Sequence, residues 1–155
     1  MYKTTTLMSA TTPELQNKIL EDFLHYFLPD GLLDFFDPVM AEDKEHQIKK
    51  DEVYKRELHL YFDERDNRTP QMQNLRPNGF TEERIISDFP ARNRKLTLHI
   101  RRRRWLDEKG NSVILNVYEL ATNGTKFSDE FAEFLKKKLG PDPRYRKIVG
   151  ALLYD

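Results

Sequence analysis

Apolar residues recur with a helical period near both ends of the chain and with a strand period in the middle. In "PELQNKILEDFLHYF" they stand four positions apart, at Leu15, Ile19, Phe23 and Phe27. That spacing is typical of an amphipathic helix. Thr12 can cap the first turn, Pro13 suits the first helical position, and "PDG" at 29–31 ends the pattern. The pattern predicts a helix that begins at Pro13.

A second helix is predicted near the C-terminus, in "FSDEFAEFLKKKLGP". Ser128 can cap it, and Asp129 and Glu130 stand in its first turn, where the helix dipole favours anions. Its last turn holds three lysines, which the dipole favours there: Lys136, Lys137 and Lys138. Gly140 and Pro141 end this helix.

Alternating apolar and polar residues predict strands between the helices. Leu58, Leu60 and Phe62 indicate a strand over about 53–63, and "ERIISDFP" indicates a short one at 83–90. After a turn at "ARNR", "KLTLHI" begins another strand, which turns at "LDEKGNS" and returns through "VILNV" as a hairpin. Together with the helices, these strands predict an α+β fold, with a small antiparallel sheet of about four strands flanked by an N-terminal and a C-terminal helix.

Three stretches lack a clear period. "GLLDFFDPV" predicts a turn or short helix that closes onto the first helix. Residues 40–52 are polar and acidic, which predicts a loop or a solvated helical turn. Residues 66–80 hold two prolines and an Asn-Gly pair, which predicts a long loop. We expect residues 1–12 to be a flexible lead-in, 13–140 to form one domain and 141–155 to be a tail or linker.

Composition narrows the class of protein. The 155 residues suit one domain, and the formal net charge is zero. Acidic residues nevertheless predominate in 1–52, whereas basic residues outnumber acidic ones in the rest. The absence of cysteine excludes disulfides and cysteine-ligated metals. No apolar run approaches the roughly 20 residues that span a membrane, and the N-terminus lacks an apolar signal core. These features predict a cytoplasmic protein without a membrane partner.

The uneven charge is concentrated around the predicted hairpin. No acidic residue stands between Asp88 and Asp107, and that interval holds seven basic ones: Arg92, Arg94, Lys95, Arg101, Arg102, Arg103 and Arg104. Such local charge attracts phosphate backbones, and the arginine fork can hold a phosphate or a guanine edge with two hydrogen bonds. Trp105 adds a flat apolar surface beside this charge. Two-residue alternation favours Arg101 and Arg103 as the more exposed pair.

A structural interpretation of the same residues stands beside the DNA-binding one. Arginines at a strand end are often solvated and discourage edge-to-edge association of sheets. A tryptophan at such a position commonly packs at the end of a hairpin or in a hydrophobic core.

The ordered segments "LPDGLLDFFD", "DFPARNRKLTLHIRRRRW" and "GTKFSDEFAEFLK" resemble the N-terminal region of certain bacterial insertion-sequence transposases that are common in Bacteroidetes. The resemblance covers most of residues 26–138. Its specificity comes from the order of the segments, since no single piece is specific. In such elements this region is often a separate short reading frame, and the catalytic domain lies in the next frame.

A wider group of transposases is similar around "DFP" and "LTLHIRRRRW". In that group the region is a small zinc ribbon, with cysteine pairs before its first strand and after its arginine-rich strand. This chain has no cysteine at either place. Its histidines also lack paired spacing: His25, His46, His59 and His99. We therefore expect a ribbon-like sheet without a metal or other cofactor.

The resemblance implies that the chain binds duplex DNA at transposon ends. The expected contacts are the seven basic residues with Trp105, extended by Lys136, Lys137 and Lys138. The catalytic domain and a second copy of the chain are further expected partners. Catalysis by this chain alone is not expected, because no nucleophile elbow or phosphate loop occurs and Asp63, Glu64 and Asp66 read as a polar turn.

Two alternatives remain open. One is a protein-interaction module, in which "LLDFFDPV" is an exposed docking patch and the arginines bind an acidic partner. That acidic partner includes this chain's own N-terminal half. The other alternative is a folded but inactive remnant of a transposase gene.

Overall fold

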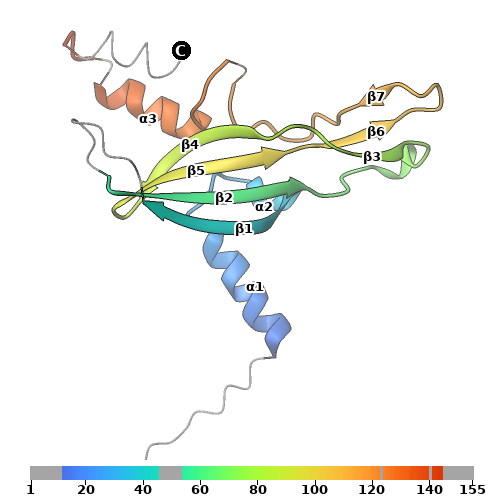
Figure 1. Ribbon diagram of the computed structural model, residues 1–155, viewed down its shortest axis with the longest axis horizontal. Coiled ribbons are helices and arrows are strands. Elements are labelled where there is room, and N and C mark those ends of the chain that lie inside the picture. The colour runs from blue at the N-terminus through green and yellow to red at the C-terminus, as the bar shows by residue number, and fades with distance from the viewer. Residues whose placement is uncertain (1–11, 46–53, 123, 140, 145–155) are drawn as a thin grey trace, which may run out of the picture.

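The computed structural model describes residues 12–45, 54–122, 124–139 and 141–144, and Figure 1 shows an elongated α+β molecule. The predicted α+β class is confirmed. The elements in chain order are α1 (Pro13–Leu24), α2 (Leu32–Phe35), β1 (Phe36–Glu45), β2 (Arg56–Glu64), the 3-10 helix η1 (Pro70–Met72), β3 (Arg76–Phe80), β4 (Arg84–Ala91), β5 (Arg94–Arg101), β6 (Arg103–Leu106), β7 (Ser112–Val113) and α3 (Asp129–Leu139). The lead-in before Thr12 and the tail after Arg144 lie outside the described residues.

The main sheet has four strands in the order β1-β2-β5-β4. β1 with β2 and β4 with β5 pair antiparallel, but β2 and β5 pair in parallel. The expectation of an entirely antiparallel sheet is therefore wrong at its centre. The chain leaves β2 for the far end of the molecule and returns through β4, so that the β4–β5 hairpin brings β5 beside β2 in the same direction (Figure 1).

A second sheet, β3-β6-β7, extends from one end of the main sheet (Figure 1), and we call these three strands the finger. β3 lies in the segment predicted as a loop, and it was missed because its partner β6 is distant in sequence. Gly79 has φ 72°, and the ladder shifts register between Pro77 and Phe80, so the Asn-Gly pair forms a bulge. The predicted return strand over "VILNV" is mostly wrong, since only Ser112–Val113 pairs with β6.

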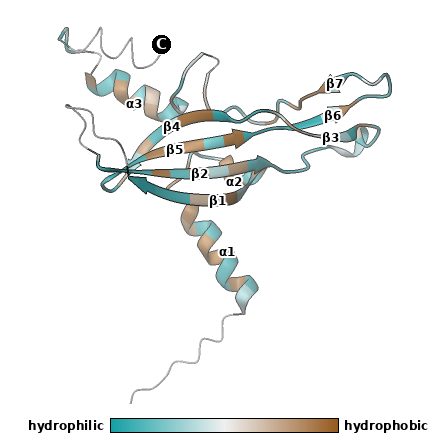
Figure 2. Cartoon of the chain, viewed as in Figure 1, coloured by the Kyte–Doolittle hydropathy of each residue, from teal (hydrophilic) through white to brown (hydrophobic). Residues whose placement is uncertain are grey.

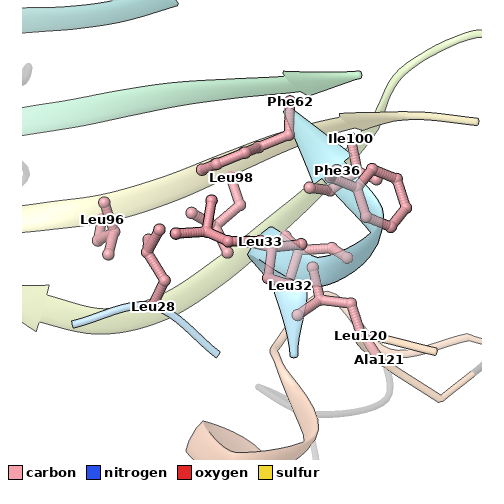
Figure 3. Close-up of a cluster of buried hydrophobic side chains, with 11 residues drawn as sticks. Leu28, Leu32, Leu33, Phe36, Phe62, Leu96, Leu98, Ile100, Leu120 and Ala121 are labelled. Carbon is pink, nitrogen blue, oxygen red and sulfur yellow. The ribbon is translucent and has the colours of Figure 1, made fainter. Parts of the chain in front are cut away.

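The core lies on one face of the main sheet (Figure 3). Alternate residues of β2, β4 and β5 point into it, as their sequence pattern predicts: Phe62, Ile86, Leu96, Leu98 and Ile100. The segment around α2 and the segment before α3 cover that face with Leu28, Leu32, Leu33, Phe36, Leu120 and Ala121. Burying apolar surface of this kind contributes roughly 25 cal/mol per Å², so the core holds the covering segments on the sheet.

The segment "LLDFFDPV" does not form the exposed docking patch of the protein-interaction alternative, because most of its apolar residues are buried. Leu32, Leu33 and Phe36 of "LLDFFDPV" are at most 4% exposed, because α2 turns them into the core. Only Val39 of that segment is a markedly exposed apolar residue. The prediction of a turn or short helix there is confirmed, but the segment packs on the sheet and not on the first helix. The expectation of an exposed patch is wrong.

The acidic segment after α2 is a strand where we expected a loop. β1 runs to Glu45 along β2. The Asp43 carboxylate accepts hydrogen bonds from Arg56 at 3.0 Å and from Arg94 at 3.1 Å, and these bonds lower the pKa of Asp43. Such cross-strand pairs override the weak strand propensity of the segment. The rest of the predicted loop, 46–52, lies outside the described residues.

The first helix forms as predicted but does not join the core. Leu15 N donates to the capping Thr12 Oγ1 at 3.3 Å, and Pro13 occupies the first turn. No residue of α1 is buried, and the helix projects away from the sheet (Figure 1). Figure 2 shows its apolar stripe, which we call the α1 apolar face: Leu15, Ile19, Leu20, Phe23 and Leu24. None of the helices in the described ranges is long and apolar enough to cross a membrane.

The last helix is held against β4 through its capping residue. Phe131 N donates to Ser128 Oγ at 3.3 Å, as expected of a cap, and the same hydroxyl donates to Asp88 at 2.6 Å. Burial raises the pKa of Asp88. The Phe89 ring packs on Phe131, with ring centroids 4.9 Å apart. The "DFP" segment of β4 therefore positions α3.

Candidate nucleic-acid interface

The four consecutive arginines lie where the main sheet passes into the finger. Arg101 ends β5, Arg103 begins β6, and Arg102 belongs to neither strand. This break interrupts the two-residue alternation of side chains. Arg101 and Arg104 are exposed, whereas Arg102 and Arg103 are half-buried. The expectation that Arg101 and Arg103 form the more exposed pair is therefore wrong for Arg103.

We call the place where β5 of the main sheet passes into β6 of the finger the junction. Two of the four arginines make hydrogen bonds within it. Arg101 donates to both carboxylate oxygens of Asp63, at 2.7 and 2.6 Å. The Arg103 side chain donates to the Glu64 carbonyl at 2.8 Å, and its backbone N–H donates to the buried Glu64 carboxylate at 2.8 Å. Both guanidinium groups lie over the Phe80 ring, 4.8 and 4.9 Å from its centroid. Part of the positive charge of the four arginines therefore stabilises the junction itself.

Trp105 is part of the finger's interior. It is 1% exposed, and the Arg68 guanidinium lies 4.4 Å from the centroid of its ring. Arg68 is fixed by Asp66, at 2.9 and 2.8 Å, and by the Leu75 carbonyl at 2.8 Å. These hydrogen bonds lower the pKa of Asp66 to about 2, so that the pair stays ionised at neutral pH. Trp105 cannot present its ring to a DNA base, and its place among the expected contacts is wrong.

Two arginines on the solvent side of the finger have no carboxylate partner among the residues that the structure describes. Arg76 pairs with Leu106 across the β3–β6 ladder, and Pro77 pairs with Trp105. Arg76 and Arg104 therefore lie on the face opposite Trp105. Both are exposed, and neither side chain makes a hydrogen bond or ion pair with another described residue. Segments 74–81 and 102–106 contain no Asp or Glu.

The remaining predicted contacts lie elsewhere. Arg92, with φ 58° in the β4–β5 turn, is exposed, and Arg94 is held by Asp43 beside the half-buried Lys95. The eight-residue β5 separates this group from Arg101 by about 23 Å, at roughly 3.3 Å per residue. The lysine-bearing end of α3 lies toward the same end of the long axis as the β4–β5 turn (Figure 1). The basic residues that were expected to share one face thus form two groups, toward opposite ends of the molecule's long axis.

Of the three lysines, Lys137 pairs with Glu133 at 2.9 Å, one helical turn away. All three are exposed at the end of α3. They extend the group near the β4–β5 turn and do not extend the arginines of the finger.

A cluster of titratable side chains lies on the sheet face opposite the core, and sequence reasoning missed it. His59 Nδ1 and His99 Nε2 are 2.7 Å apart, so one ring donates to the other. Tyr61 stacks on His99, with ring centroids 4.2 Å apart. Glu57 lies 3.6 Å from His59 Nε2. Glu83 lies 3.2 Å from His99 Nδ1, which is buried and makes no well-aligned hydrogen bond.

Only the parallel pairing of β2 with β5 creates this cluster. Both histidines occupy polar positions of strands with alternating apolar and polar residues, and this alternation was the only sign of them in the sequence. The parallel register that places β2 beside β5 could not be predicted from it. Burial lowers the pKa of His59 and favours its neutral form. Among the described residues, no group of three or more His, Asp or Glu side chains could hold a metal ion.

No protein-family model, curated protein or solved structure matches this chain. Function is therefore inferred from the arrangement of the basic residues on the finger and from the pattern of the sequence.

Proposed function

We propose that the chain binds duplex DNA, as the N-terminal recognition region of an insertion-sequence transposase. The proposal rests on two exposed arginines, Arg76 and Arg104, which have no carboxylate partner among the described residues and stand on strands that contain no acidic residue, β3 and β6. A two-stranded β-ribbon is narrow enough to enter the DNA major groove. In the finger the two strands β3 and β6 carry these arginines, and β7 adds only the two residues Ser112–Val113 beside β6. Guanidinium groups on such a ribbon can reach phosphates or guanine edges there.

The resemblance of "DFPARNRKLTLHIRRRRW" to transposase N-terminal regions supplies the biological context. By this proposal the finger contacts the ends of the mobile element, and the group around Arg92, Lys95 and Lys138 adds phosphate contacts on longer duplexes. The catalytic domain is expected on a separate or downstream reading frame, and this chain is expected to have no catalytic activity by itself. Such a protein would work in the cytoplasm, where a bacterial chromosome lies.

The test is fluorescence anisotropy with labelled duplexes. The probes are the terminal repeats that flank the gene and a scrambled duplex of the same length and composition. We expect tighter binding to the repeats, and about tenfold or greater weakening for the double variant Arg76→Ala/Arg104→Ala, at about 1 kcal/mol or more per lost charged contact.

The matched control is Lys18→Ala/Lys55→Ala, which removes the same charge from exposed positions outside the finger. It should bind the repeats nearly as tightly as the unmodified protein. Equal losses in both double variants would mean that net charge alone drives binding. No binding of either duplex at low salt would contradict the proposal.

The α1 apolar face favours a second candidate function, the contact of one copy of this chain with another. At 100° per residue its five apolar side chains cover about half of the helix circumference. A 12-residue helix with no buried residue is marginal in water by itself. Because α1 projects from the sheet (Figure 1) and none of its residues is buried, its apolar face is accessible to a second copy.

A further inference from the structure

A cavity of about 630 Å³ opens beside the junction, between the main sheet and the segment that leads toward α3. Its volume is within the range of roughly 300–1,000 Å³ that small-molecule sites occupy. It is distinct from the finger face of Arg76 and Arg104, because neither residue lines it.

The floor of the cavity is apolar. Phe36, Ile86, Ile100 and Leu120 form it, and all four are buried core residues. Tyr118 forms a wall: its ring stacks on Phe35, and its hydroxyl donates to the Asp30 carbonyl at 2.7 Å. The cavity therefore offers a rigid apolar surface that can accept a planar group.

Two arginines stand at the rim, and their guanidinium groups are bonded to neutral acceptors. Arg84 Nη2 donates to the carbonyls of Thr122 and Thr125, at 2.9 and 3.3 Å. Arg102 Nη2 donates to the Tyr118 carbonyl at 2.9 Å, and its Nη1 donates to Asn116 Oδ1 at 3.4 Å. Each guanidinium has five N–H groups, so several donors remain on both. No carboxylate among the described residues is bonded to either group, so the positive charge of both is available to an anion.

The same segment anchors both arginines. Arg102 Nη2 is bonded to the Tyr118 carbonyl, and Arg84 Nη2 to the carbonyls of Thr122 and Thr125, on the segment that leads toward α3. Both arginines also line the one cavity. Two guanidinium groups that border one cavity can bind the same phosphate, whose oxygens accept paired hydrogen bonds from arginine forks.

The rest of the rim can contact a base edge. Thr81 Oγ1 accepts from Arg102 N at 3.1 Å and Asn116 Oδ1 accepts from Arg102 Nη1, which leaves the hydroxyl proton and the amide NH₂ to donate to a base. Glu119 contributes a carboxylate, which accepts from an exocyclic amino group. An apolar floor, two arginines and a few polar groups suit a ligand with one planar part and one anionic part.

We propose that this cavity binds a nucleotide, with the base on the apolar floor beside Tyr118 and the phosphate between Arg84 and Arg102. The nucleotide can be free in solution, or it can belong to a DNA strand from which its base is turned out of the stack. Binding of a free nucleotide does not depend on the proposed recognition of transposon ends. Binding of a turned-out base adds a second contact to that function.

The first test is a ¹H–¹⁵N titration of the unmodified protein with the four deoxynucleoside monophosphates and with a single-stranded octamer. We expect shifts at the backbone amides of Thr81, Arg102 and 116–120. Free nucleotides that shift these amides identify a free ligand, and an octamer that alone shifts them identifies a nucleotide within a strand. No shift with any probe at millimolar concentration, or shifts confined to the finger, would overturn the proposal.

The second test is calorimetry with altered ligands and variants. The nucleoside without its phosphate, and the protein variant Arg102→Gln, should each bind about tenfold or more weakly, as expected for a charge-assisted contact. The control Lys109→Gln, in the exposed β6–β7 turn, should bind normally.

Because Arg102 also braces the Tyr118 segment, a second variant guards against misfolding. Asn116→Trp places a bulky side chain at the exposed rim and removes only the 3.4 Å bond from Arg102 Nη1, while the bond from Arg102 to the Tyr118 carbonyl stays, so this variant should block binding in a folded protein. Unchanged affinity in both variants would refute the assignment. The failure of duplex binding in the anisotropy experiment would leave the result for free nucleotides standing, so the two proposals fail separately.

Discussion

At the scale of single residues, the histidine pair is the most distinctive feature of the sheet. The 2.7 Å contact between His59 and His99 requires that at least one facing nitrogen be unprotonated. Burial keeps the pKa of His59 below its ordinary value of 6.5. Glu57 and Glu42 act in the opposite direction but are the smaller influence on His59, and Lys44 adds to the lowering.

We expect the free energy of unfolding to fall when the pH falls below about 6.5. Below that value the unfolded chain takes up a proton on His59 that the folded protein resists, so the unfolded state is favoured. The measurement is urea unfolding at pH 7.5 and pH 5.5. The variant His59→Gln should show a flatter dependence, and an unchanged slope in that variant would contradict the assignment to His59.

The bond between Asp88 and Ser128 gives a second prediction at this scale. Asp88→Ala leaves the buried Ser128 hydroxyl without its acceptor, which should cost about 1–3 kcal/mol of unfolding free energy. Asp88→Asn keeps an acceptor oxygen and removes a charge that burial disfavours, so its stability should stay near that of the unmodified protein. Urea unfolding at pH 7 measures both, and equal losses would mean that the carboxylate charge itself is required.

At the scale of elements, the contrast between the two helices shows how one sequence pattern has two outcomes. α1 and α3 both have an apolar stripe and a capped start. α3 is attached to β4 through Ser128 and Phe131, whereas α1 has no such attachment in the part of the chain that the structure describes. Periodicity therefore predicted both helices but not which one would be covered.

We expect the chain to dimerise through the α1 apolar face. Leu20 and Phe23 are 59% and 58% exposed, and Leu20→Lys/Phe23→Lys should convert dimers to monomers in sedimentation equilibrium at micromolar concentrations. The control Glu21→Lys puts a lysine on the polar side of the same helix and should leave the dimer intact. A monomer in the unmodified protein at every concentration would exclude self-association by this face.

At the scale of the whole molecule, a neutral net charge conceals separated groups of cations. Arg76 and Arg104 lie on the finger, and Arg92 and the α3 lysines lie toward the opposite end of the long axis. Several other basic side chains form ion pairs with neighbouring carboxylates, as Arg101 does with Asp63 and Arg94 with Asp43. The molecule can therefore present much less charge to one DNA site than its ten predicted basic contacts suggest.

The salt dependence of DNA binding should show this reduction. Each phosphate contact contributes about 0.9 to the slope of log K against log salt concentration. A short duplex that only the finger can cover should give a slope of about 2, and Arg76→Ala/Arg104→Ala should abolish most of it. Anisotropy titrations between low and moderate salt measure the slope. A slope near 10 would mean that the paired arginines leave their carboxylates to bind DNA.

The sequence by itself determined the features that depend on neighbours along the chain. The α1 cap at Thr12, the Ser128 cap, the short helix in "LLDFFDPV" and the strand alternation of Leu58 to Phe62 and Leu96 to Ile100 are all local patterns, and all were predicted. Local hydrogen bonds and side-chain periodicity control these features, so a short window of sequence contains the necessary information.

Only the tertiary structure decided how those elements meet. The parallel pairing of β2 with β5, the strands β1 and β3, the burial of Trp105 and the division of the basic residues all depend on partners far away in sequence. The same holds for the contact of His59 with His99 and for the cavity between Arg84 and Arg102. Long-range register is set by the burial of one face of the sheet, and no local pattern of residues specifies which strands will share that face.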